Sequence, residues 1–177
     1  MLVKIISGAQ TGADRAALDA ALELGIPCGG WVPKGRYAED GEIPERYPDL
    51  KETPDAEVEM RTEWNIRDSD ATLIVSHGPL EGGSLYTKVK AGELGKPWLH
   101  LDLSGLSHDQ AVTTARKWLE DVRPAVLNIA GILTYMRKRS GCFARSFRWY
   151  ADRRYRQKRM PPGLNNEFWK RSNPVKK

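Results

Sequence analysis

Residues 2–15 read Leu-Val-Lys-Ile-Ile-Ser-Gly-Ala-Gln-Thr-Gly-Ala-Asp-Arg, and this stretch decides how the rest of the chain is read. The short β-branched apolar run predicts a strand over 2–6, and apolar residues at helical spacing predict a helix from Ala13 to Leu24. The glycine-rich stretch between them predicts a loop at the carboxyl end of the strand. This order of strand, loop and helix is the unit from which α/β folds are built.

The same alternation continues along the chain. Further strands are expected over 28–32, 71–76, 98–103 and 125–131, and further helices over 57–67, 84–94 and 107–121. The run at 71–76 is apolar on both faces, which is typical of a strand in a parallel sheet with helices on both sides. The segment 33–55 is rich in Gly, Pro and charge and predicts a long surface loop. We therefore predict a Rossmann-like three-layer α/β fold with a mainly parallel sheet and helices on both faces.

Charge divides the chain into two parts. Residues 1–136 carry 14 Lys and Arg against 21 Asp and Glu, whereas residues 137–177 carry 14 against 2. We predict a ligand-binding domain over 1–131, followed over 132–177 by an atypical basic tail that is out of frame with the ancestral gene or poorly ordered. No apolar run approaches the roughly 20 residues that cross a bilayer, and Cys28 and Cys142 have no metal-binding or disulfide spacing. A cytoplasmic protein is expected.

The first candidate site is the loop between the first strand and the first helix. Its residues are Gly8, Ala9, Gln10, Thr11 and Gly12, followed by Arg15. Glycines let a ligand approach the backbone, and the N–H groups at a helix start favour an anion such as phosphate. The pattern is neither a dinucleotide-binding fingerprint nor a P-loop. Thr11 and Asp14 could instead simply cap the helix.

The second candidate site follows the buried strand 71–76 in the same way. Its residues are Gly78, Gly82, Gly83 and Ser84, and the adjacent glycines could form either an anion-binding nest or only a tight turn. Two such loops meet if the sheet places their strands close together, because open parallel sheets bind ligands at the carboxyl ends of their strands. The pair of loops predicts a phosphorylated small ligand.

A polar helix precedes that strand. Arg61, Asn65 and Asp68 lie on one face by their spacing and could reach the ligand, or could form an exposed, ion-paired surface. His77 stands beside the second loop, where an acid or a phosphate contact could be placed. His100 has no motif around it and is expected to lie outside the site.

Four motifs together carry a family resemblance. They are Ser-Gly-Ala-Gln-Thr-Gly-Ala-Asp-Arg at 7–15, Gly-Gly-Trp-Val-Pro-Lys-Gly-Arg at 29–36, Arg-Thr-Glu-Trp-Asn at 61–65 and Gly-Pro-Leu-Glu-Gly-Gly-Ser at 78–84. In this order they resemble the molybdenum cofactor carrier proteins, a Rossmann-like family related to the lysine-decarboxylase-like phosphoribohydrolases. The resemblance covers about residues 2–131. It implies a carrier of molybdenum cofactor (molybdopterin), whose dithiolene already holds the metal, so no protein metal ligands are expected.

The resemblance also sets out the alternatives. The related hydrolases carry Pro-Gly-Gly-x-Gly-Thr-x-x-Glu, whereas here Gly82-Gly83-Ser84 is followed by Leu-Tyr-Thr-Lys without the catalytic Glu. A carrier rather than an enzyme is therefore expected, with a nucleotide-binding sensor or a phosphoribohydrolase-like enzyme as the alternatives. Relatives of this fold commonly form homo-oligomers, and a carrier would deliver its cargo to a molybdoenzyme. Nucleic-acid binding through the basic tail is the weakest alternative.

Overall fold

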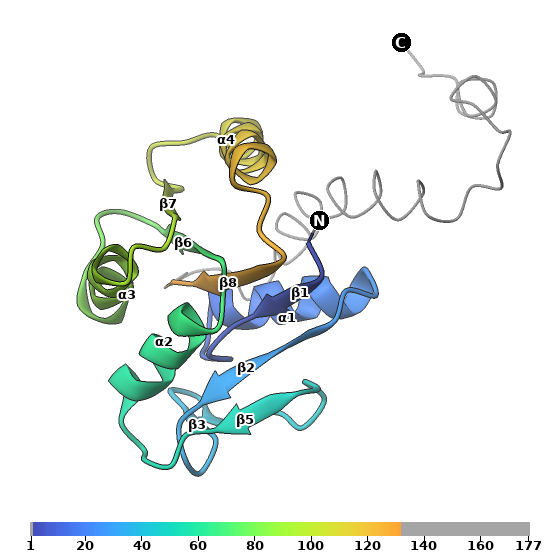
Figure 1. Cartoon of the computed structure of the whole chain (residues 1–177), viewed down its shortest axis with the longest axis vertical. Helices are drawn as coiled ribbons and strands as arrows, with labels where there is room; N and C mark the ends of the chain where they lie inside the picture. The colour runs from blue at the N-terminus through green and yellow to red at the C-terminus, as the bar shows by residue number, and fades with distance from the viewer. Residues whose placement is uncertain (1, 132–177) are drawn as a thin grey trace, which may run out of the picture.

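The computed structural model describes residues 2–131, and the tail predicted over 132–177 lies outside the described residues. Its sheet has six strands in the order β5-β2-β1-β8-β6-β7, and every pairing within it is parallel. The strands are β1 (Lys4–Ile6), β2 (Cys28–Val32), β5 (Leu50–Glu52), β6 (Ala71–Ser76), β7 (Trp98–Asp102) and β8 (Val126–Ala130). The predicted Rossmann-like α/β fold is confirmed, and Figure 1 shows β8, the last strand of residues 2–131, between β1 and β6.

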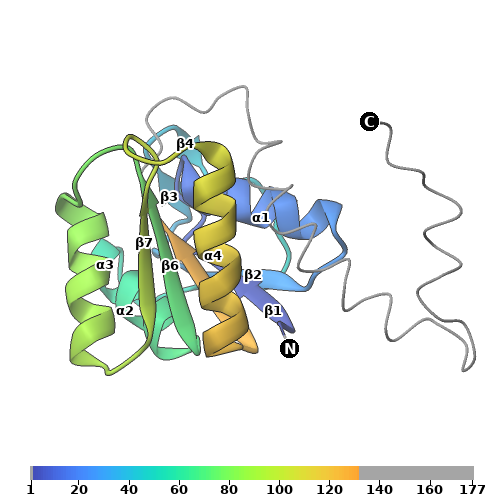
Figure 2. The ribbon, with the colours of Figure 1, turned by 90° about the horizontal axis from the view of Figure 1, so that it is seen from above.

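Helices lie on both faces of the sheet. They are α1 (Ala13–Glu23), α2 (Val58–Arg67), α3 (Gly82–Glu93) and α4 (His108–Val122). Apolar side chains of α1 and α4 join one core cluster with Leu73 and Val75 of β6 and Leu127 and Ile129 of β8. Because side chains alternate along a strand, Thr72 and Ile74 face the other side, where α3 contacts β6 and packs against α2. In Figure 2, β6 and β7 stand between α3 and α4.

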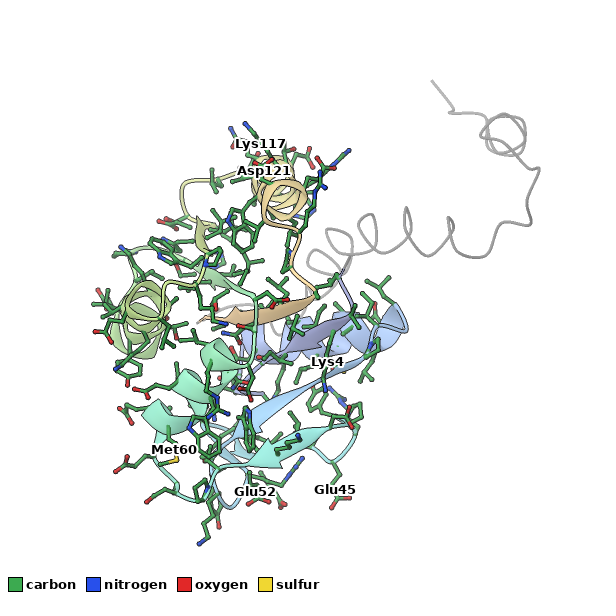
Figure 3. All side chains as sticks on the ribbon, viewed as in Figure 1. Lys4, Glu45, Glu52, Met60, Lys117 and Asp121 are labelled. Carbon is green, nitrogen blue, oxygen red and sulfur yellow. The ribbon has the colours of Figure 1, made fainter. Side chains whose placement is uncertain are left out.

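The amphipathic pattern of α4 shows why the helices were predictable. Ala111, Ala115 and Leu119 recur every four residues and are buried. Lys117 and Asp121 point away from the sheet on the outer side of the helix (Figure 3). At the start of α4, Ser107 and Gln110 form a reciprocal capping box.

The segment 33–55, predicted as a loop, contains three strands. β3 (Tyr37–Ala38) and β4 (Gly41–Glu42) form an antiparallel hairpin, and β5 extends the main sheet beside β2. These strands have two or three residues each and little apolar pattern, so only their pairing partners define them. The helix predicted from Ser84 begins at Gly82, which places the adjacent glycines in its first turn.

Candidate functional site

The first glycine loop, residues 7–12, joins β1 to α1. Its last residue, Gly12, is the N-cap of α1 with φ of +80°, and no side chain caps the helix. The possibility that Thr11 or Asp14 caps α1 is therefore excluded. The Asp14 carboxylate lies in the first turn of α1 and accepts from Gln10 N at 3.3 Å, so the positive end of this helix already faces one carboxylate.

The polar side chains of the first glycine loop contact the β3–β4 hairpin, residues 37–42. Gln10 Nε2 donates to the Tyr37 carbonyl oxygen at 3.0 Å, and Thr11 Oγ1 donates to Glu39 at 2.8 Å. Both terminal nitrogens of Arg15 donate to the Asp40 carboxylate, at 2.5 and 2.7 Å. The Thr11 hydroxyl and the Arg15 guanidinium, both candidates for binding a phosphate, thus already have carboxylate partners.

Arg61 of α2 lies against the base of the same loop. A Cβ at position 8 would overlap the Arg61 guanidinium, so only glycine lets this side chain approach. Arg61 Nη1 lies 3.6 Å from Asp14 Oδ2; the Asp14 side chain is buried and that of Arg61 is largely covered. One buried atom here, Arg61 Nε, has no hydrogen-bond partner within residues 2–131. Orphaned buried polar atoms of this kind are rare and point to an absent partner, either water or ligand.

Asp14 is the unusual titrating group of this region. Burial raises its pKa from 3.8 to about 6, although the positive charge of Arg61 and the N–H groups of Gln10 and Gly131 act in the opposite direction. Sequence reasoning considered Asp14 only as a helix cap. Its pairing with Arg61 joins residues 47 positions apart and had no local signal.

Asn65, predicted beside Arg61 as a ligand contact, is engaged with the backbone of β2. Its Oδ1 accepts from Trp31 N at 2.9 Å, and its Nδ2 donates to Trp31 O at 2.8 Å and to Arg61 O at 2.9 Å. Asp68 accepts from Trp31 Nε1 at 2.7 Å and from Arg67. Of the predicted face of α2, Arg61 therefore lies at the first glycine loop, while Asn65 and Asp68 attach the helix to β2.

The second glycine loop, residues 77–84, runs from the end of β6 into α3. The N-cap of α3 is Glu81 in extended conformation, again without a side-chain cap. A Cβ at Gly82 or Gly83 would meet open space, whereas Ser84 is buried. His77 is exposed. Gly82 and Gly83 thus form an open, uncapped helix start of the kind predicted.

Residues of β7 hold the second glycine loop in place. Ser76 Oγ donates to the Gly78 carbonyl oxygen at 2.6 Å and contacts His100 Nε2 at 2.8 Å. Gly78 N donates to Asp102 Oδ1 at 2.8 Å. Hydrogen bonds from Ser104 and from Gly78 N lower the pKa of Asp102 to about 2. His100 on β7, which pairs beside β6, contacts Ser76 and not the residues of the loop itself, so its place outside the site stays a prediction.

The two loops lie at the same edge of the sheet. They follow β1 and β6, which flank β8, so their strands are two positions apart. Neighbouring strands are about 4.8 Å apart, which places the strand ends about 10 Å from each other. This spacing favours an elongated ligand with a different group on each loop over a single anion between them.

Three further observations concern the described residues as a whole. Within residues 2–131, no group of three or more His, Cys, Asp or Glu side chains could hold a metal ion. None of the helices described is both long and apolar enough to cross a membrane. Burial raises the pKa of the Cys28 thiol, which agrees with a core residue rather than a reactive nucleophile.

Comparison with known proteins places these features in a family. The sequence model of the circularly permutated YpsA SLOG family matches residues 5–140. A crystal structure named "Putative molybdenum carrier protein", from Syntrophus aciditrophicus SB, is similar with a TM-score of 0.76 and 47% sequence identity. The alignment covers 83% of this chain and 93% of that one. No curated protein matches the chain significantly.

Proposed function

Because the chain belongs to the circularly permutated YpsA SLOG family, we propose that it is a carrier of molybdenum cofactor. The cargo is a phosphorylated pterin that already holds its metal. The observation that carries the proposal is the pair of uncapped helix starts, α1 and α3, at one edge of the sheet. The name of the solved relative agrees with this cargo.

The donor set at this edge fits the cargo. A phosphate needs N–H donors, which the backbone of Gly82 and Gly83 would supply at the start of α3. Arg61 Nε, which has no partner within residues 2–131, is a further donor at the first glycine loop. The dithiolene supplies the sulfur ligands of the metal, so protein metal ligands are not required. The carrier would release its cargo to a molybdoenzyme, and self-association into a homo-oligomer remains our prediction.

A carrier is favoured over a phosphoribohydrolase-like enzyme by the side chains of α3. Residues 84–90 contain no carboxylate at the place where the related hydrolases have their catalytic Glu. Glu63 of α2 is the carboxylate that reaches α3, where Tyr86 and Lys90 bind it and lower its pKa. A carboxylate held ionised in this way is a poor proton donor.

Gly83→Asp tests the proposal. It would place a negative charge at the start of α3, where the phosphate would bind, and open space around position 83 lets the fold accept the side chain. Loss of one or two charge-assisted hydrogen bonds, roughly 1.5 to 3 kcal/mol each, lowers cofactor affinity by about a hundredfold. Titration of molybdopterin into the purified protein measures the effect.

Gly92→Asp is the matched control. It makes the same change on the same helix, also in open space, but at the opposite end from the site. We expect it to bind molybdopterin like the wild type, with thermal melts confirming that both variants fold. Gly12→Asp is less informative because φ of +80° at Gly12 strains any side chain there. Equal affinities of Gly83→Asp and Gly92→Asp would remove the phosphate-binding role of α3.

A further inference from the structure

The β3–β4 hairpin is attached to the first glycine loop through side chains of the loop. Gln10 contacts the Tyr37 backbone, Thr11 contacts Glu39, and Arg15 forms a two-pronged ion pair with Asp40. Figure 2 shows β3 and β4 at the end of the sheet where the β6–α3 and β7–α4 connections leave the strands. The hairpin is therefore part of the edge at which the proposed ligand binds.

Tyr37 presents its ring to solvent from this hairpin. The side chain is 69% exposed, the largest exposure among the large hydrophobic residues described. One edge of the ring nevertheless lies against Gly35, where φ is +84° and a Cβ would overlap Cε2 of the ring. The carbonyl of Tyr37 is fixed by Gln10. The ring is thus held in position while most of its surface stays open.

The surroundings of Tyr37 do not resemble a protein-docking surface. Its exposed charged neighbours in the segment are Lys34, Glu39, Asp40 and Glu42, the last of which pairs with Tyr37 across the hairpin, so the ring is a single apolar group among charges. Protein interfaces present contiguous apolar patches with charges depleted at their centre. A single fixed aromatic ring beside the first glycine loop instead suits a flat ligand ring, which stacks on it whatever its hydrogen-bonding pattern.

We propose that the β3–β4 hairpin recognises the ring system of the ligand, with Tyr37 as its stacking platform. The ligand class is a planar fused heterocycle that carries a phosphate. The inference rests on the proposed function, since it assumes that the start of α3 binds the phosphate. Glu39 and Asp40 act as positioning residues that hold the hairpin to Thr11 and Arg15.

The experiment compares two probes on three proteins. GMP has a guanine ring that shares the aminopyrimidinone edge of a pterin, and ribose 5-phosphate has the phosphate without the ring. Wild type, Tyr37→Ala and Tyr37→Phe are titrated with both probes by calorimetry. We expect Tyr37→Ala to bind GMP about tenfold or more weakly, the usual loss for one base–aromatic stack. Its affinity for ribose 5-phosphate is unchanged, and Tyr37→Phe binds both probes like the wild type.

The outcomes separate the two proposals. Unchanged GMP affinity in Tyr37→Ala overturns the stacking role while leaving the phosphate-binding role intact. An equal loss for both probes also overturns it, because the variant would then have disturbed the first glycine loop. Wild type that binds neither probe contradicts the proposed function and the inference together. Thermal melts serve as the folding control, since an exposed side chain such as Tyr37 is expected to contribute little to stability.

Discussion

Asp14 is a carboxylic acid buried in the folded protein. Burial of its carboxyl opposes ionisation, so the folded protein retains the proton up to a pH of about 6, whereas the unfolded chain loses it near 3.8. Between these values the folded state binds more protons than the unfolded state. The free energy of unfolding therefore falls as pH rises through this window, by about 3 kcal/mol in total.

Asp14→Asn removes this titration and is expected to remove its pH dependence. The stability of wild type relative to the variant should decrease from pH 4 to pH 7, with the change complete once Asp14 has ionised in the folded protein. Urea unfolding followed by tryptophan fluorescence at unit pH steps measures it. Asp121→Asn, on the exposed face of α4, controls for the loss of one carboxylate. Parallel pH curves for wild type and Asp14→Asn contradict the prediction.

At the scale of elements, the attachment of α2 to β2 positions Arg61. Asn65 satisfies both backbone groups of Trp31, and the Trp31 and Trp64 rings meet edge to face at 4.6 Å between centroids. Arg61 is one turn away on the same helix and depends on this packing to reach Gly8. Asn65 therefore acts on the site through the placement of α2.

Asn65→Ala is expected to destabilise the fold. It leaves the N–H and C=O of the partly buried Trp31 without their partners, at a cost of roughly 1 to 3 kcal/mol for each unsatisfied group. Urea unfolding gives the loss, and Arg67→Ala, an exposed change two residues along the helix, is the control. If Asn65→Ala were as stable as Arg67→Ala but lost ligand affinity, Asn65 would be a ligand contact instead, as its sequence pattern suggested.

At the scale of the whole molecule, charge is distributed very unevenly. Residues 1–136 carry a net charge of −7 and residues 137–177 one of +12. Any affinity of the full chain for DNA or RNA should therefore belong to residues 132–177, which follow the last strand. If the tail neutralises six or more phosphates, its affinity for the nucleic acid should fall by about 10³-fold or more between 50 and 200 mM salt.

A chain ending at Gly131 keeps every element described here and provides the comparison. It should show no binding to a DNA duplex at 150 mM salt in a fluorescence anisotropy titration, while retaining any affinity for molybdopterin. Persistent DNA binding by the shortened chain would favour a nucleic-acid function for the domain itself.

Local sequence was sufficient for the elements that carry their own signal. The strands 28–32 and 71–76 were predicted with the bounds that the structure has, because runs of apolar residues between glycine or turn signals define them without reference to other segments. The starts of α1 and α3, with the glycines of both loops, were likewise evident from composition and order. The sequence therefore determined the α/β alternation and the two loops at strand ends.

Tertiary structure decided what depends on residues far apart in the chain. β5 is a strand only because Leu50–Glu52 pairs with β2, and the placement of β8 between β1 and β6 sets the distance between the two glycine loops. Three further contacts likewise join separate segments of the chain. They are those of Arg61 with Asp14, of His100 with Ser76, and of the β3–β4 hairpin with the first glycine loop. Hydrogen bonds and ion pairs between such segments have no periodicity in sequence, so only the packed sheet and its helices select the partners.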